Sequence, residues 1–271
     1  MFYSKNLMYI CIMKVFLQKI NKKCFFVFLF YIFDFAILFS QIKITKAEDF
    51  EEGLVLEFQE CKPDSVFPGP SGKNQIWDFS NLKPTSNKIT QKIMSIKSTS
   101  YDDYFPDAQL AEVNSDGTFV FFRKTKSENY LVGFADERQE MTMKYVDNMI
   151  FMKRPIQFGD SISDTFRREY STSYFEFKGN GTVTIVADGY GKLILPNKTY
   201  DKVLRVKIVQ ESLDTLDQYK TKNKTTNITY LWFNNENKST LLKINELTTP
   251  FFTNKTVLYL LSETNEKKKK N

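Results

Sequence analysis

The side chains that could perform acid–base chemistry in this chain are mainly carboxylates, because its 271 residues include no histidine. The absence of histidine excludes Ser-His-Asp and Cys-His catalysis, as well as zinc sites that need imidazole. Acidic residues lie close in sequence at Asp102-Asp103, at Asp136-Glu137, and at Asp214 with Asp217. Two carboxyl groups about 5–10 Å apart across a cleft could hydrolyse a glycosidic bond. Solvated surface acids are the simpler interpretation, because carboxylates are rarely buried.

Cysteine offers little further chemistry. Cys11 and Cys24 lie within the first 40 residues, so Cys61 is the only thiol in the rest of the chain. A single cysteine cannot form an internal disulfide or a cysteine-cluster metal site. It also lacks a histidine that could activate it as a nucleophile. We therefore predict that Cys61 is a buried structural thiol, and we predict neither a metal site nor a cofactor.

Three aromatic residues are the candidates for contacts with a ligand. Trp77 follows a loop rich in glycine and proline, Tyr190 lies between Gly189 and Gly191, and Trp232 lies in an apolar Tyr-Leu-Trp-Phe run. Aromatic rings can serve as platforms for sugars or lipids, although buried aromatic residues more often serve core packing. The two glycines are not followed by a Lys-Ser/Thr pair or by a helix, as a phosphate loop requires. They indicate a β-bulge or a sheet corner instead.

The elements that must position these residues are expected to be strands. Short runs of alternating apolar residues are separated by turn signals from residue 54 to residue 262, and no long segment has a helical period. The pattern predicts an all-β fold, an antiparallel β-sandwich or open β-barrel of roughly a dozen strands. Residues 41–53 are expected to be a polar lead-in and 263–271 a charged tail. Gly179-Asn180-Gly181 is expected to form a tight hairpin turn.

The first 40 residues have the composition of a signal peptide. Lys19, Lys22 and Lys23 precede the apolar run 24–39, and Ser40 offers a small residue at the expected cleavage point. The run has about 16 residues and contains Asp34, whereas a spanning helix needs about 20 apolar residues. We predict an exported protein with a cleaved leader over residues 1–40, with Met13 as an alternative start.

The net charge of +6 does not indicate a nucleic-acid partner. Five lysines lie in the predicted leader and four more at 267–270, so the remaining chain has slightly more acidic than basic residues. It shows no basic stripe of the kind that binds phosphate backbones. We therefore expect the partner to be an envelope glycan, a lipid or a protein rather than nucleic acid.

Several stretches together resemble a family of secreted proteins from Bacteroidota that often carry a C-terminal type IX secretion sorting domain. The matching residues are 38–41, 68–69, 72–82, 105–106, 155–161, 189–207 and 230–233. The resemblance implies export and a β-rich architecture, but no activity. The chain stops soon after Leu261 without the sorting domain, so periplasmic residence is expected. The meander of strands that includes the Tyr-Leu-Trp-Phe run is also similar, more faintly, to periplasmic half-barrel proteins that hold lipid.

Three functions remain open at this point. The first is a non-enzymatic envelope protein that binds or scaffolds, and the second is a carrier that holds an apolar ligand inside a barrel. The carrier hypothesis requires an enclosed apolar pocket of about 300 Å³ or more. The third is a carboxylate-dependent glycoside hydrolase, which requires two acids in one cleft, one of them with a raised pKa.

Overall fold

The computed structural model describes residues 42–216 and 221–266, which form one compact unit. The predicted leader, the lysine run 267–270 and Asp217 lie outside these residues. No helix in the described ranges is long and apolar enough to cross a membrane.

The described residues form fifteen strands and one short 3-10 helix, Ile96–Ser98, and contain no α-helix. The strands are β1 (Lys43–Ile44), β2 (Leu54–Cys61), β3 (Gly72–Asp78), β4 (Pro84–Ser95), β5 (Leu110–Asn114), β6 (Thr118–Lys124), β7 (Glu128–Asp136), β8 (Met141–Lys153), β9 (Ile156–Gln157), β10 (Ser161–Ser171), β11 (Glu176–Ile194), β12 (Thr199–Leu216), β13 (Thr221–Phe233), β14 (Leu242–Thr248) and β15 (Thr253–Asn265).

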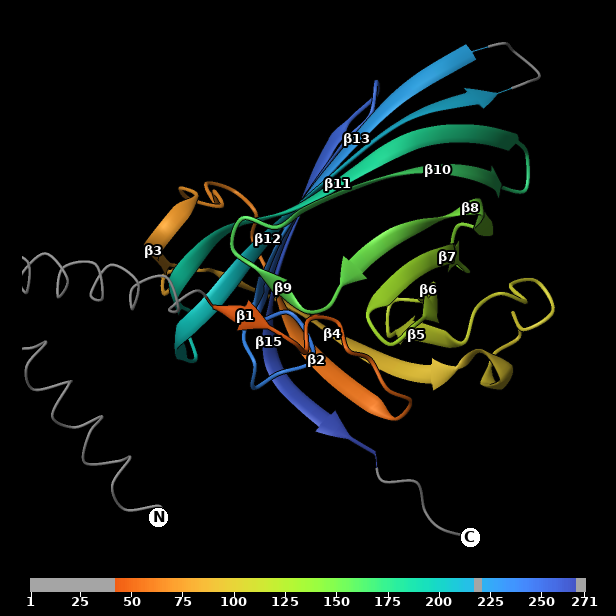
Figure 1. The fold of residues 1–271 in the computed structure, drawn as a ribbon. Coiled ribbons are helices and arrows are strands. Elements are labelled where there is room, and N and C mark those ends of the chain that lie inside the picture. The colour runs from red at the N-terminus through yellow and green to blue at the C-terminus, as the bar shows by residue number, and fades with distance from the viewer. Residues whose placement is uncertain (1–41, 217–220, 267–271) are drawn as a thin grey trace, which may run out of the picture. The chain divides into compact units, whose positions relative to one another are not determined.

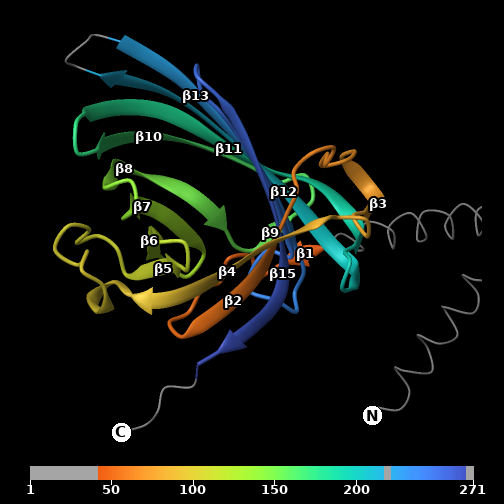
Figure 2. The same cartoon turned by 180° about the vertical axis from the view of Figure 1, so that it is seen from behind.

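Twelve of these strands form a closed antiparallel barrel (Figures 1 and 2). Each pairs with its neighbours along the chain, and β15 pairs with β2. The ring closes because β10 pairs with both β8 and β11. The prediction of an all-β fold with about a dozen strands is confirmed, and the barrel is the form it takes.

The barrel wall in one region is buried on both faces, because β3 covers its outside. β3 pairs in parallel with the last part of β11, and its Trp77 belongs to the same buried cluster as Leu242 and Ile244 of β14. Neighbouring residues on a strand point to opposite faces. Lys243 and Asn245 therefore point inward, toward the space that the barrel encloses.

The expected hairpin turn at Gly179-Asn180-Gly181 is wrong, because β11 runs through it without interruption. The two glycines instead make room for side chains of neighbouring strands. A Cβ atom at Gly181 would lie 2.4 Å from the Phe166 ring, and one at Gly179 would lie 2.0 Å from the Asp214 carboxylate. The predicted irregularity at Gly189–Gly191 is confirmed, since the pairing of β11 with β12 shifts on both sides of this segment.

β10 pairs with its two neighbours, β8 and β11, over different lengths. β10 pairs with β8 only over Arg167–Ser171, whereas it pairs with β11 along its whole length.

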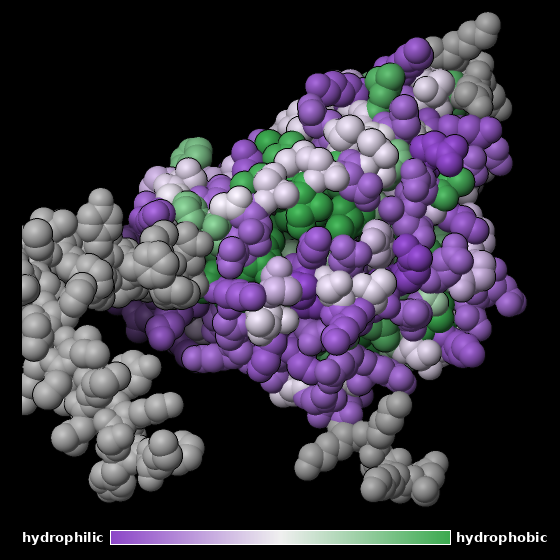
Figure 3. Space-filling view, in the orientation of Figure 1, coloured by the Kyte–Doolittle hydropathy of each residue, from purple (hydrophilic) through white to green (hydrophobic). Residues whose placement is uncertain are grey.

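The predicted lead-in is more than a linker, because Ile44 and Ala47 are fully buried against residues of β8, β10 and β11. Figure 3 shows that the drawn face of the molecule is mostly polar, with a patch of apolar surface near its centre.

Candidate functional site

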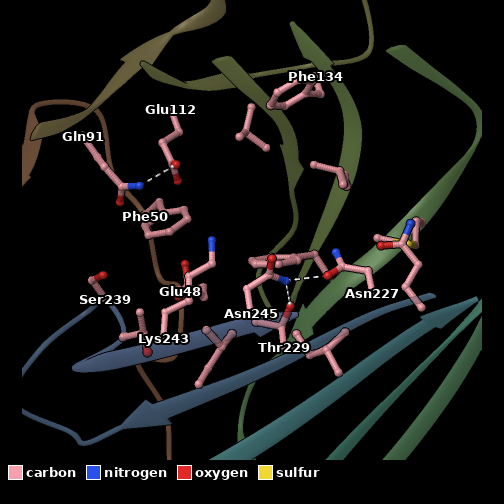
Figure 4. A pocket seen from close by; sticks show the side chains of 18 of the residues that line it. Glu48, Phe50, Gln91, Glu112, Phe134, Asn227, Thr229, Ser239, Lys243 and Asn245 are labelled. Atoms are coloured by element: carbon pink, nitrogen blue, oxygen red, sulfur yellow. Dashed lines mark hydrogen bonds between the residues drawn. The ribbon is translucent and has the colours of Figure 1, made fainter. Parts of the chain in front are cut away.

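The barrel encloses a cavity of about 340 Å³ (Figure 4). Among the described residues, every barrel strand except β11 contributes a side chain to its wall, and Glu48 and Phe50 reach it from the segment before β2. Much of the wall is apolar, including Phe50, Phe58, Val120, Leu131, Phe151 and Leu258. The cavity therefore lies within the barrel and is partly open to solvent.

A cluster of charged side chains forms one side of this cavity. Figure 4 shows Glu48, Glu112 and Lys243 gathered there, beside Gln91. The Glu112 carboxylate accepts hydrogen bonds from the Gln91 amide at 2.9 Å and from the Asn114 amide at 3.2 Å. Glu48 is only 5% exposed. Within the described parts of the chain, neither its carboxyl group nor the Lys243 ammonium has a hydrogen-bond or ion-pair partner.

Burial dominates the electrostatics of the two acids. Burial, with a smaller contribution from the nearby Glu112, raises the pKa of Glu48 to about 8 against the opposing effects of Lys243 and Arg154. Burial likewise raises the pKa of Glu112, while Lys243 and the hydrogen bond from Asn114 lower it. Desolvation disfavours the ionised form of a carboxyl group. Glu48 is therefore mainly a neutral acid at pH 7.

The backbone around Glu48 is held firmly in place. Its φ of 51° lies in the left-handed region that non-glycine residues rarely adopt. The Glu48 carbonyl accepts hydrogen bonds from the Asn129 amide at 2.6 Å and from the buried Arg154 guanidinium at 3.2 Å. The Lys124 ammonium pairs with the next residue, Asp49, at 2.7 Å. These contacts fix the direction in which the Glu48 side chain enters the cavity.

Two further polar groups in the cavity wall are satisfied by the protein itself. The Asn245 amide donates hydrogen bonds to Asn227 and, at 2.8 Å, to the Thr229 hydroxyl. The Arg168 guanidinium forms a two-pronged ion pair with Asp214, at 3.0 and 2.7 Å. Both groups shape the wall, but Arg168 brings no unpaired charge to the cavity.

The structure does not place the three predicted aromatic residues in the cavity. Trp77 and Trp232 are buried with their rings in an edge-to-face contact at 5.9 Å, in the layer outside the barrel wall. Trp232 follows Leu231, which lines the cavity, so its own side chain points the opposite way. Tyr190 lies in a different cluster, packed against Phe158 at 5.3 Å. None of the three touches the cavity.

The other residues singled out from the sequence also lie elsewhere. Asp102-Asp103 and Asp136-Glu137 are not part of the cavity wall, and Asp214 is held by Arg168. Cys61 is buried as predicted, and burial raises the pKa of its thiol to about 11, which suppresses thiolate chemistry. The described residues contain no group of three acidic or cysteine side chains that could hold a metal ion.

Fold and site together define a closed β-barrel with an internal cavity of mixed polarity. Comparison of the chain with protein-family models, with curated proteins and with solved structures finds no match. The cavity is therefore the feature that indicates the function.

Proposed function

We propose that this is an exported protein that binds a small amphipathic molecule inside its barrel. The observation that carries the proposal is the cavity of about 340 Å³, which lies at the lower end of the range for small-molecule sites, about 300–1,000 Å³. Its wall combines a large apolar area with a few polar groups, the usual composition of a ligand site. The same cavity meets the size that the carrier hypothesis requires.

The lack of a partner for Glu48 supports a binding role. A polar group in the wall of a cavity takes its hydrogen bonds from water or from a ligand when the protein supplies none. Glu48 faces the cavity, so a bound molecule can supply the partner that the described protein does not. Export is supported by the predicted leader alone, and residence in the periplasm or outside the cell follows from that prediction.

Filling the cavity should abolish binding. We expect Val120→Trp, which places a large ring inside the barrel, to weaken binding of the neutral amphiphile decan-1-ol at least about tenfold, because ligand and ring compete for the same apolar surface. The matched control is Val146→Trp on the same barrel, since Val146 is exposed. Calorimetric titration of the full chain gives the affinity and the stoichiometry, and circular dichroism verifies that both variants fold. Equal binding by the two variants would place any ligand outside the cavity.

One observation favours a carboxylate-dependent glycoside hydrolase as a second candidate function. Glu48 and Glu112 line one cavity, and the pKa of each is raised, as a general acid requires. Hydrolysis of a glycan that is lost in both Glu48→Gln and Glu112→Gln would establish this function. We favour binding, because Lys243 and the amides of Gln91 and Asn114 already occupy the surroundings of the two acids.

A further inference from the structure

We propose that the ligand carries a carboxylate head group on an apolar chain, with the head bound between Lys243 and Glu48. This inference rests on the proposed function, because it names the ligand class of the same cavity. The geometry that supports it is the convergence of two unpartnered polar side chains from distant parts of the sequence. Lys243 enters from β14 and Glu48 from the segment before β2, and both face the same side of the cavity (Figure 4).

These two groups are distinguished from the other charged groups of the wall by their hydrogen bonding. Glu112 is satisfied by Gln91, and Arg168 is satisfied by Asp214. Lys243 and Glu48 face the cavity, and neither side chain has a hydrogen-bond partner among the described residues. A ligand head group can therefore form hydrogen bonds with these two side chains.

The protonation of the cluster selects the charge of the head group. The titratable groups that act on Glu48 are Glu112, Lys243, Arg154 and Glu263, and burial outweighs them all. At neutral pH a protonated Glu48 offers an O–H donor, and a lysine ammonium offers three N–H donors. Two donors on one side of a cavity complement an acceptor, and the positive charge favours an anionic one. A cationic head would be repelled by Lys243 and would have to ionise Glu48.

The remainder of the wall suits an apolar chain. Phe50 lies beside the charged cluster. Val120 and Leu258 are the cross-strand partners of Glu112 and Lys243, and Phe58 and Leu131 add further apolar surface to the wall. A cavity near the lower end of the usual size range favours a chain of medium length over a long one. The expected ligand class is therefore a medium-chain monocarboxylate.

The test compares three molecules with the same chain and different head groups, namely decanoate, decan-1-ol and decylamine. We expect calorimetric titration at pH 7 to show decanoate binding about tenfold to a hundredfold more tightly than decan-1-ol, the range for a charge-assisted hydrogen bond, and decylamine binding most weakly. Lys243→Met keeps the length of the side chain and removes its charge. It should remove most of the preference for decanoate over decan-1-ol. Lys255→Met, outside the cavity, is the matched control and should change neither affinity.

A second readout is the pH dependence of decanoate binding. We expect the affinity to fall above pH 8 as Glu48 loses its proton, and we expect Glu48→Gln to remove this loss. Equal affinities for decanoate and decan-1-ol would overturn the head-group assignment and leave the proposed function intact. Tightest binding of decylamine, dependent on Glu48, would reverse the sign of the head group. Binding of none of the three would overturn both this inference and the proposed function.

Discussion

Replacing Glu48 with glutamine is expected to raise the free energy of unfolding by about 3 kcal/mol at pH 7, at about 1.4 kcal/mol for each pKa unit. The pKa of Glu48 rises from 4.5 to about 8 on folding. Between these values the folded protein holds a proton that the unfolded chain releases. Stability is therefore lost as the pH rises through this window, and it is unaffected by this group below pH 4.5. Glutamine has nearly the same shape and no proton to hold.

The gain in the free energy of unfolding from Glu48→Gln is expected to depend on pH. We expect urea unfolding to show almost no difference from the original protein at pH 4.5 and a difference that increases up to pH 8. Glu176→Gln is the matched control, because Glu176 is exposed on β11. Its effect should stay within about 0.5 kcal/mol, as for most surface substitutions. A difference that did not change with pH would show that Glu48 is not held as a neutral acid.

Replacing Trp77 with alanine is expected to lower the free energy of unfolding by about 3–5 kcal/mol, the usual range for truncating a large buried aromatic side chain. The Trp77 ring packs edge to face on Trp232, and the Arg205 guanidinium lies 5.2 Å from its centre. Its indole nitrogen donates a hydrogen bond to the Pro70 carbonyl at 3.1 Å. Truncation would leave a void and release the loop that precedes β3.

The Trp77 substitution also separates packing from binding. Since Trp77 lies outside the barrel wall, we expect the folded Trp77→Ala protein to bind decan-1-ol with unchanged affinity. Phe67→Ala serves as the comparison, because Phe67 is 72% exposed and should change stability little. An unaltered free energy of unfolding together with lost binding would contradict the core role of Trp77 and restore it as a ligand contact.

The barrel strands could be predicted from the sequence because apolar residues recur in them at every second position. In β11, Val183, Ile185 and Ala187 are buried and alternate with less buried residues. The closure of the ring could not be predicted, because the pairings of β2 with β15 and of β10 with β8 join strands through contacts that no local pattern encodes. The prediction of a hairpin turn at Gly179 and Gly181 is wrong for a related reason. Their role depends on Phe166 and Asp214 in neighbouring strands.

The candidate site was largely missed in the sequence, and the reasons are physical. Glu48 lies in a short polar segment without periodicity, so its burial follows only from the packing of Ile44 and Ala47 against the barrel. The position of Lys243 could have been predicted. A charged residue between Leu242 and Ile244 indicates a strand with one apolar face, the outward one, and Lys243 lies on the inward face. The tryptophans are candidates because aromatic rings can serve as platforms for a ligand, but large apolar rings are also favoured in the core.

The most direct test of ligand binding inside the barrel is native mass spectrometry of the full chain, purified without detergent from cells that export it. We predict a protein cleaved before Gln41 that carries one non-covalent adduct. The adduct should be present with Val146→Trp and absent with Val120→Trp, because only the second substitution fills the cavity. Identical spectra for all three proteins, either bare or with the same adduct, would contradict the account.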